Sequence, residues 1–132
     1  MSSHWSLLVL RISAVLATLV AIFQTTSGFG WAGAFSVHPR TGELVTVLLV
    51  VAAVAGYLWS RRSGNKGLFM HAAGMAVLGV IQIAIGHMDL RQVHMVIGVV
   101  FLVGVIALAT LAFGKPGVDG AVEGRRAARV ES

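Results

Sequence analysis

Two histidines in this chain share a local pattern in which a glycine follows four residues later. The pattern occurs as His38-x-x-x-Gly42 and again as His94-x-x-x-Gly98. Positions four apart share one face of a helix, so each histidine should lie beside a spot that has no side chain. Imidazole is an axial ligand of heme iron, and two facing imidazoles give a six-coordinate, low-spin centre suited to electron transfer. The pattern predicts heme b bound by His38 and His94, with Gly42 and Gly98 clearing space for the macrocycle.

Polar residues near the two histidines could complete such a site. Arg40 and Arg91 are candidate partners of the heme propionates, because guanidinium groups pair well with carboxylates, or they are simple interfacial anchors. Gln24 and Gln82 should face inward, since an amide is costly in lipid. There they would contact the macrocycle, support a histidine or join two helices. His87 is a candidate propionate partner, histidine support or alternative axial ligand, and an exposed interfacial position is an equal alternative.

Other interpretations of these residues stay open at this stage. The two histidines could be interfacial side chains solvated by lipid headgroups. With His87 and Glu43 they could hold zinc or copper, because imidazoles and a carboxylate suit those metals. His71 and His4 could hold a second heme at the opposite side, although His4 lies close to the start of the chain and has no matching glycine. We favour an interfacial His71.

Composition assigns the chain to a bilayer. Of its 132 residues, 57% are hydrophobic and 11% are charged, against about 25% charged in an ordinary soluble domain. The mean hydropathy is +0.87. A spanning helix needs about 20 apolar residues. The sequence offers four such segments, near 7–29, 40–60, 67–87 and 91–113.

The basic residues indicate how these segments are oriented. By the positive-inside rule, the side that carries most of them is cytoplasmic, and with it both termini. Those residues are Arg11, Arg61, Arg62, Lys66, Lys115, Arg125, Arg126 and Arg129. Trp5, Tyr57 and Trp59 should mark the inner interface and Trp31 the outer one. The net charge of +5 is therefore topological information and attraction to anionic lipid, not a nucleic-acid site.

Short connections favour one compact fold. We expect an all-α, integral membrane, antiparallel four-helix bundle of up-down-up-down topology over residues 1–114, and a polar, disordered cytoplasmic tail over 115–132. The first segment should be retained, because no small-residue cleavage site follows a short apolar core. Pro39 suits the first turn of the second helix. Asp89 and Gln92 have the spacing of a capping box at the start of the fourth.

At His38 and His94 the chain resembles one half of the heme A synthase family, over about residues 7–113. That resemblance implies a four-helix bundle with heme ligands at the outer ends of its second and fourth helices. It also resembles small four-helix membrane proteins of actinobacteria. The synthase pattern has a glutamate in the outer loop before the second-helix histidine, and this chain has none between Ser27 and Val37. The resemblance therefore implies heme binding and not the oxygenase reaction.

The leading expectation is a small b-type cytochrome in a bacterial inner (plasma) membrane. Its partners would be heme, the lipid bilayer and a larger respiratory or redox complex, or further copies of itself. The main alternative is an accessory or scaffold subunit without its own cofactor. An enzyme of heme or quinone metabolism is disfavoured, because Glu43 is the one acid at the edge of a span. A transporter is least favoured, since no helix is broken at mid-bilayer. The chain has no cysteine, which excludes disulfides and thiolate metal sites.

Overall fold

The computed structural model describes residues 3–30, 36–114 and 129–130. In these residues the chain forms four long α-helices and no strand. They are α1 (Ser3–Gly28), α2 (His38–Ser63), α3 (Gly67–His87) and α4 (Arg91–Phe113). The expected all-helical fold with four helices is confirmed, and each helix is long and apolar enough to cross a membrane. The expectations for Trp31 and for the tail at 115–128 and 131–132 lie outside the described residues.

Two helices are longer than hydropathy alone indicates. α1 begins at Ser3 rather than near residue 7. α2 begins at His38, with Pro39 in its first turn, where the missing N–H has no helical acceptor to lose. It ends at Ser63 because Gly64 takes a left-handed conformation, with φ of 74°, and donates its N–H to the carbonyl of Ser60. An average of hydropathy along the sequence detects apolar runs, so it misses the polar ends of these helices.

The capping box expected at Asp89 and Gln92 is wrong. Leu90 is the N-cap residue of α4, and no side chain caps this end. Asp89 instead has φ of 57°, a left-handed conformation that aspartate tolerates better than most residues. The connection from His87 to Arg91 is so short that it needs such a residue to reverse the chain. Asp89 is part of the turn between α3 and α4, so it is not the residue that caps the first turn of α4.

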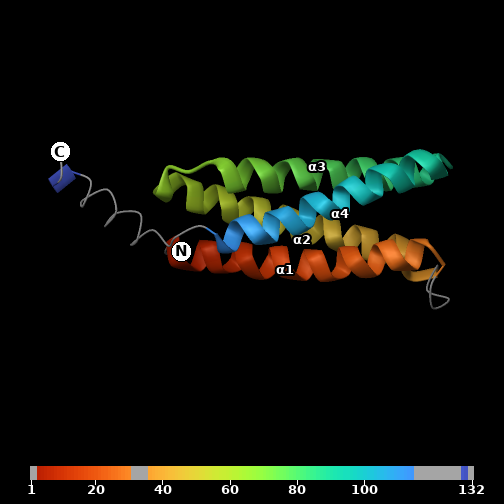
Figure 1. The fold of residues 1–132 in the computed structure, drawn as a ribbon, viewed down its shortest axis with the longest axis horizontal. Helices are drawn as coiled ribbons and strands as arrows, with labels where there is room; N and C mark the ends of the chain where they lie inside the picture. Colours follow the sequence, from red (N-terminus) through yellow and green to blue (C-terminus); the bar gives the residue numbers. More distant parts are fainter. Residues whose placement is uncertain (1–2, 31–35, 115–128, 131–132) are drawn as a thin grey trace.

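Each helix packs against two others. α1 contacts α2 and α4, and α3 contacts the same two, so α2 and α4 stand diagonally across the bundle. Figure 1 shows that α2 and α4 both begin at the right-hand end of the molecule, where α1 and α3 both end. The first residues of α2 and α4 are therefore brought to one end by the path of the chain.

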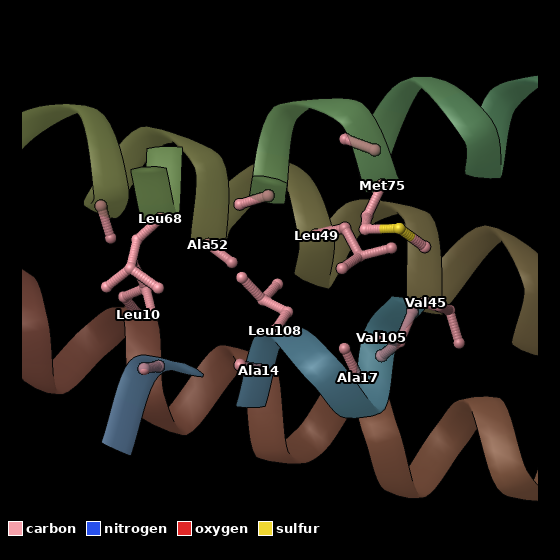
Figure 2. Close-up of a cluster of buried hydrophobic side chains, with 14 of the residues drawn as sticks. Leu10, Ala14, Ala17, Val45, Leu49, Ala52, Leu68, Met75, Val105 and Leu108 are labelled. Atoms are coloured by element: carbon pink, nitrogen blue, oxygen red, sulfur yellow. The ribbon is translucent and has the colours of Figure 1, made fainter. Parts of the chain in front are cut away.

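Buried positions recur at alternating steps of three and four residues along every helix. This spacing keeps one stripe of each helix against its neighbours, as in left-handed bundles in water and in membranes. Small residues fill much of the stripe on α1, where Ala14, Ala17 and Ala21 are buried, and leucines fill the centre (Figure 2). The buried stripes comprise Leu7, Leu10, Ala14, Ala17 and Ala21 of α1; Val45, Leu49, Ala52 and Trp59 of α2; Leu68, Ala72 and Met75 of α3; and Phe101, Val105, Leu108 and Ala112 of α4.

The outward faces of the helices are also apolar. Large side chains such as Leu19, Val54, Val77 and Val103 are more than half exposed. A soluble protein does not carry an apolar surface of this extent, whereas lipid accommodates it. Trp59 is buried at 2% exposure, and its indole N–H has no partner among the described residues.

Candidate functional site

The three-and-four spacing of the buried stripes continues past the apolar core to the end where α2 and α4 begin. There the residue types change from apolar to glutamine, histidine and glycine. α1 and α3 each contribute a glutamine followed four residues later by a glycine, and α2 and α4 each contribute a histidine followed likewise by a glycine. We call these eight residues the end cluster: Gln24, Gly28, His38, Gly42, Gln82, Gly86, His94 and Gly98.

The structure brings His38 and His94 together across the bundle. Their ring centroids are 5.9 Å apart and their planes cross at 73°. Both side chains are half-buried. The facing of these two residues, which the sequence predicts from their spacing alone, thus depends on α2 and α4 being diagonal and beginning at the same end.

Each imidazole is held from behind by the helix that precedes its own. The Nδ1 of His38 donates to the backbone carbonyl of Gln24 at 3.1 Å, and the Nδ1 of His94 donates to the carbonyl of Gln82 at 3.1 Å. A carbonyl can only accept, so Nδ1 must carry the proton. In a neutral ring the lone pair is then on Nε2, which is the arrangement that metal-binding histidines use.

The glycines of α1 and α3 make room for the imidazole rings. A Cβ atom on Gly28 would lie 2.9 Å from Cε1 of His38, and one on Gly86 would lie 3.4 Å from Cε1 of His94. Neither glycine has a positive φ, so the requirement is for space rather than for backbone freedom. Sequence reasoning assigned neither residue to the site. The repeated spacing of Gln24 with Gly28 and of Gln82 with Gly86 could have identified them.

The glycines of α2 and α4 face the glutamine amides. A Cβ atom on Gly42 would lie 3.0 Å from Nε2 of Gln24, and one on Gly98 would lie 3.1 Å from Nε2 of Gln82. The sequence predicts open space for a macrocycle above these two glycines. In this structure the amides cover them, so that prediction requires the amides to move.

The two amides differ in what else they contact. The Gln24 amide nitrogen lies 3.2 Å from Nε2 of His38, and its oxygen accepts a hydrogen bond from the hydroxyl of Thr41. The Gln82 amide nitrogen donates to the backbone carbonyl of His94 at 3.1 Å. Its oxygen is buried without a partner among the described residues, and the side chain is only 8% exposed.

A cavity of about 450 Å³ opens at this end of the bundle. All eight residues of the end cluster line it, together with the aromatic rings of Phe29 and Phe101. The volume lies within the range of small-molecule and cofactor sites, about 300–1,000 Å³. Polar groups are few in the wall and include both imidazoles, which is the composition such sites have.

Other predicted residues are distributed unevenly around this cavity. Arg91 and His87 are exposed and line it, and Nδ1 of His87 donates to the carbonyl of Ile83 at 2.8 Å. Glu43 is also exposed and lines it. Arg40 is exposed and does not line it. No group of three or more His, Cys, Asp or Glu side chains suited to a metal occurs among the described residues, which does not support the zinc or copper alternative.

The histidines proposed for a second heme do not come together with each other. His71 bonds across to α4, where its Nε2 lies 2.8 Å from the carbonyl of Gly104. His4 is exposed and packs edge-on against Trp5. This places the His71 side chain in the contact between α3 and α4.

Comparison with known proteins adds no relative. The chain matches no family model, no curated protein and no solved structure. The resemblance to half of a heme A synthase therefore stays a prediction. The interpretation of the site depends on the geometry of its own residues.

Proposed function

We propose that this chain is a small heme-binding membrane protein, a b-type cytochrome that holds heme b between α2 and α4. His38 and His94 would be the axial ligands. The observation that carries the proposal is the facing pair of imidazoles, each with Nδ1 bonded to a backbone carbonyl and both in the wall of one cavity.

The surroundings of the two rings support this assignment. A metal-ligating histidine usually donates its second ring N–H to a carbonyl or a carboxylate, which fixes the ring and raises its basicity. Both histidines have that bond. Their ring planes cross at 73°, and two imidazoles that bind the two sides of one heme can be rotated relative to each other in this way. The mostly apolar cavity between α2 and α4 suits a macrocycle. When bound, heme iron supplies reversible one-electron transfer.

The arginines would serve the propionates of the macrocycle. Arg91 is exposed at the cavity, so its guanidinium can meet a carboxylate there in a bidentate pair. Arg40, two residues after His38, would reach the same surface by rotation of its long side chain. His87 lies at the cavity beside them and would assist at the edge of the group.

The orientation of the bundle follows from the distribution of positive charge. We infer an antiparallel, up-down-up-down bundle with both termini cytoplasmic, since Arg61, Arg62 and Lys66 lie at the end opposite the end cluster. The heme would then lie near the outer face of a bacterial inner membrane. Its task would be electron transfer or heme handling beside a larger redox partner.

A second candidate is an accessory subunit without its own cofactor. The contact that favours it is the amide of Gln24, which engages Nε2 of His38 and covers Gly42. In that case the end cluster would be a self-contained polar network joining the four helices. The two candidates differ in one measurable property, the uptake of heme.

The experiment is heme titration of the purified full-length protein in detergent, followed by absorbance of the dithionite-reduced sample. We expect a sharp Soret band and a distinct α band, typical of low-spin heme b. His38→Ala and His94→Ala should each abolish the low-spin spectrum. His87→Ala is the matched control and should retain it, because the bond of His87 among the described residues is to Ile83 of its own helix. A folded wild-type protein that takes up no heme would refute the proposal and favour the accessory subunit.

A further inference from the structure

The two halves of the end cluster differ in what lies beside the Nε2 atom of the imidazole. Nε2 of His38 lies 3.2 Å from the amide nitrogen of Gln24. Because Nδ1 of this ring is already a donor, Nε2 accepts, and the amide must donate to it. The lone pair that would bind iron is therefore engaged by a side chain of the same protein.

Nε2 of His94 has no such neighbour within the part of the chain that the structure describes. The equivalent amide, that of Gln82, donates instead to the backbone carbonyl of His94 at 3.1 Å. Its oxygen is buried and has no hydrogen-bond partner among the described residues. One histidine of the pair is thus ready to coordinate, and the other must first lose a hydrogen bond.

The residue three positions after the histidine also differs between the two halves, and it bears on the glutamine amide. Three residues after His38 stands Thr41, and its hydroxyl, which lies within 3.0 Å of the carbonyl of His38, donates to the amide oxygen of Gln24. Three residues after His94 stands Ile97, which has no hydroxyl. Thr41 holds the Gln24 amide in the position where its nitrogen meets His38. Among the described residues, no hydroxyl bonds to the amide oxygen of Gln82, and its nitrogen bonds to the backbone carbonyl of His94 instead.

We propose that Gln24, held by Thr41, competes with heme iron for Nε2 of His38, so that His94 is the resident axial ligand and His38 is the exchangeable one. This inference rests on the proposed function. When the amide returns to His38, the coordination position on that side becomes available to a small neutral diatomic molecule. The site would then be a heme that can bind such a ligand as well as pass electrons.

The size of the effect follows from the hydrogen bond that is exchanged. A net intramolecular hydrogen bond is worth about 0.5–1.5 kcal/mol, which corresponds to about a two- to tenfold change in an equilibrium constant. Removing the competing amide, or the hydroxyl that holds it, should therefore strengthen the bond to His38. Binding of an external ligand at the same position should weaken by that factor.

The test is the affinity of the reduced, heme-loaded full chain for carbon monoxide, measured by its absorbance change. Gln24→Leu and Thr41→Val should each lower the affinity about two- to tenfold. The matched controls are Gln92→Leu and Thr110→Val, which make the same changes at exposed positions outside the cavity. These controls should leave the affinity at the wild-type value.

The outcomes separate this inference from the proposed function. Wild-type protein that binds heme and carbon monoxide, with weaker binding in both variants, supports the inference. If heme is bound but carbon monoxide affinity is the same in wild type, Gln24→Leu and Thr41→Val, the inference is overturned and heme binding stands. If the folded wild type binds no heme, both are overturned. A second readout, the high-spin fraction of the ferric protein, should fall in the two variants and stay constant in the controls.

Discussion

The first helix pair, α1 with α2, and the second, α3 with α4, build the same end cluster with different detail. Both bond the Nδ1 of a histidine to a glutamine carbonyl at 3.1 Å, and both set a glycine against the ring. The first pair adds Thr41, and its amide meets the imidazole nitrogen; the second has Ile97, and its amide meets the backbone. The repeated residues position the two rings, and the residues that are not repeated, Thr41 and Ser27, add hydroxyl contacts to the first pair alone among these positions.

Removal of each histidine in turn should give the largest difference between the two helix pairs. His94→Ala removes the Nε2 atom that no side chain of the described residues engages, and we expect the variant to lose most of its heme. His38→Ala should retain heme as a five-coordinate, high-spin centre held by His94. Heme content per chain and the ferric absorbance spectrum measure both. Equal heme loss in the two variants would mean that the halves are equivalent.

The glycines opposite the rings should differ in their tolerance of a methyl group. In Gly28→Ala the new Cβ would lie 2.9 Å from the His38 ring, whereas in Gly86→Ala it would lie 3.4 Å from the His94 ring. Overpacking of this kind costs about 1–3 kcal/mol. We expect Gly28→Ala to displace His38 and reduce the low-spin fraction, with a smaller change in Gly86→Ala. Spectra of the two heme-loaded variants decide, and a larger loss in Gly86→Ala would contradict the packing argument.

The second helix pair has a polar contact between its helices outside the end cluster. Nε2 of His71 lies 2.8 Å from the carbonyl of Gly104, linking α3 to α4. His71→Ala should lower the free energy of unfolding by about 0.5–1.5 kcal/mol, the net value of one hydrogen bond. The heme spectrum should not change. The two measurements are thermal unfolding in detergent and the absorbance spectrum of the reduced protein. Loss of a heme signal would instead support a second heme bound by His71.

Making the second half more like the first should have the smallest effect. Ile97→Thr places a hydroxyl at the position that Thr41 has in the other pair, where we expect it to meet the unpartnered oxygen of Gln82. The Gln82 amide should then turn toward His94, and carbon monoxide affinity should rise because the second ligand is weakened too. We expect a change of no more than about threefold, less than one full hydrogen bond. Affinity unchanged from wild type would show that Thr41 does not account for the asymmetry.

Much of the fold could be predicted from hydropathy. A helix in lipid must form all its backbone hydrogen bonds internally and present apolar side chains to the lipid. The ends of α1 and α2 could not be predicted in this way, since Ser3 and Ser63 belong to polar turns that an apolar window ignores. The capping box failed at Asp89 for a different reason. A short turn can require a left-handed residue, and that demand depends on how far the next helix lies, which is a property of the tertiary structure.

The sequence predicted the two histidines of the candidate site but not the residues that surround them. Their spacing to glycine indicated that both would face inward at one end, but it did not indicate what would cover the glycines. The amides of Gln24 and Gln82 do so, and they come from other helices. Contacts between helices depend on their register, which a pattern within one helix does not contain. The role of Gly28 was missed for the same reason.

The central claim is that the two facing imidazoles hold one heme. The measurement that tests it most directly is the ratio of heme b to protein, with the reduced absorbance spectrum, in full-length protein purified from membranes of cells supplied with heme. The account predicts one low-spin heme per chain, and none in the His38→Ala, His94→Ala double variant. A folded wild-type protein that is colourless, or a double variant that binds as much heme as wild type, would contradict it.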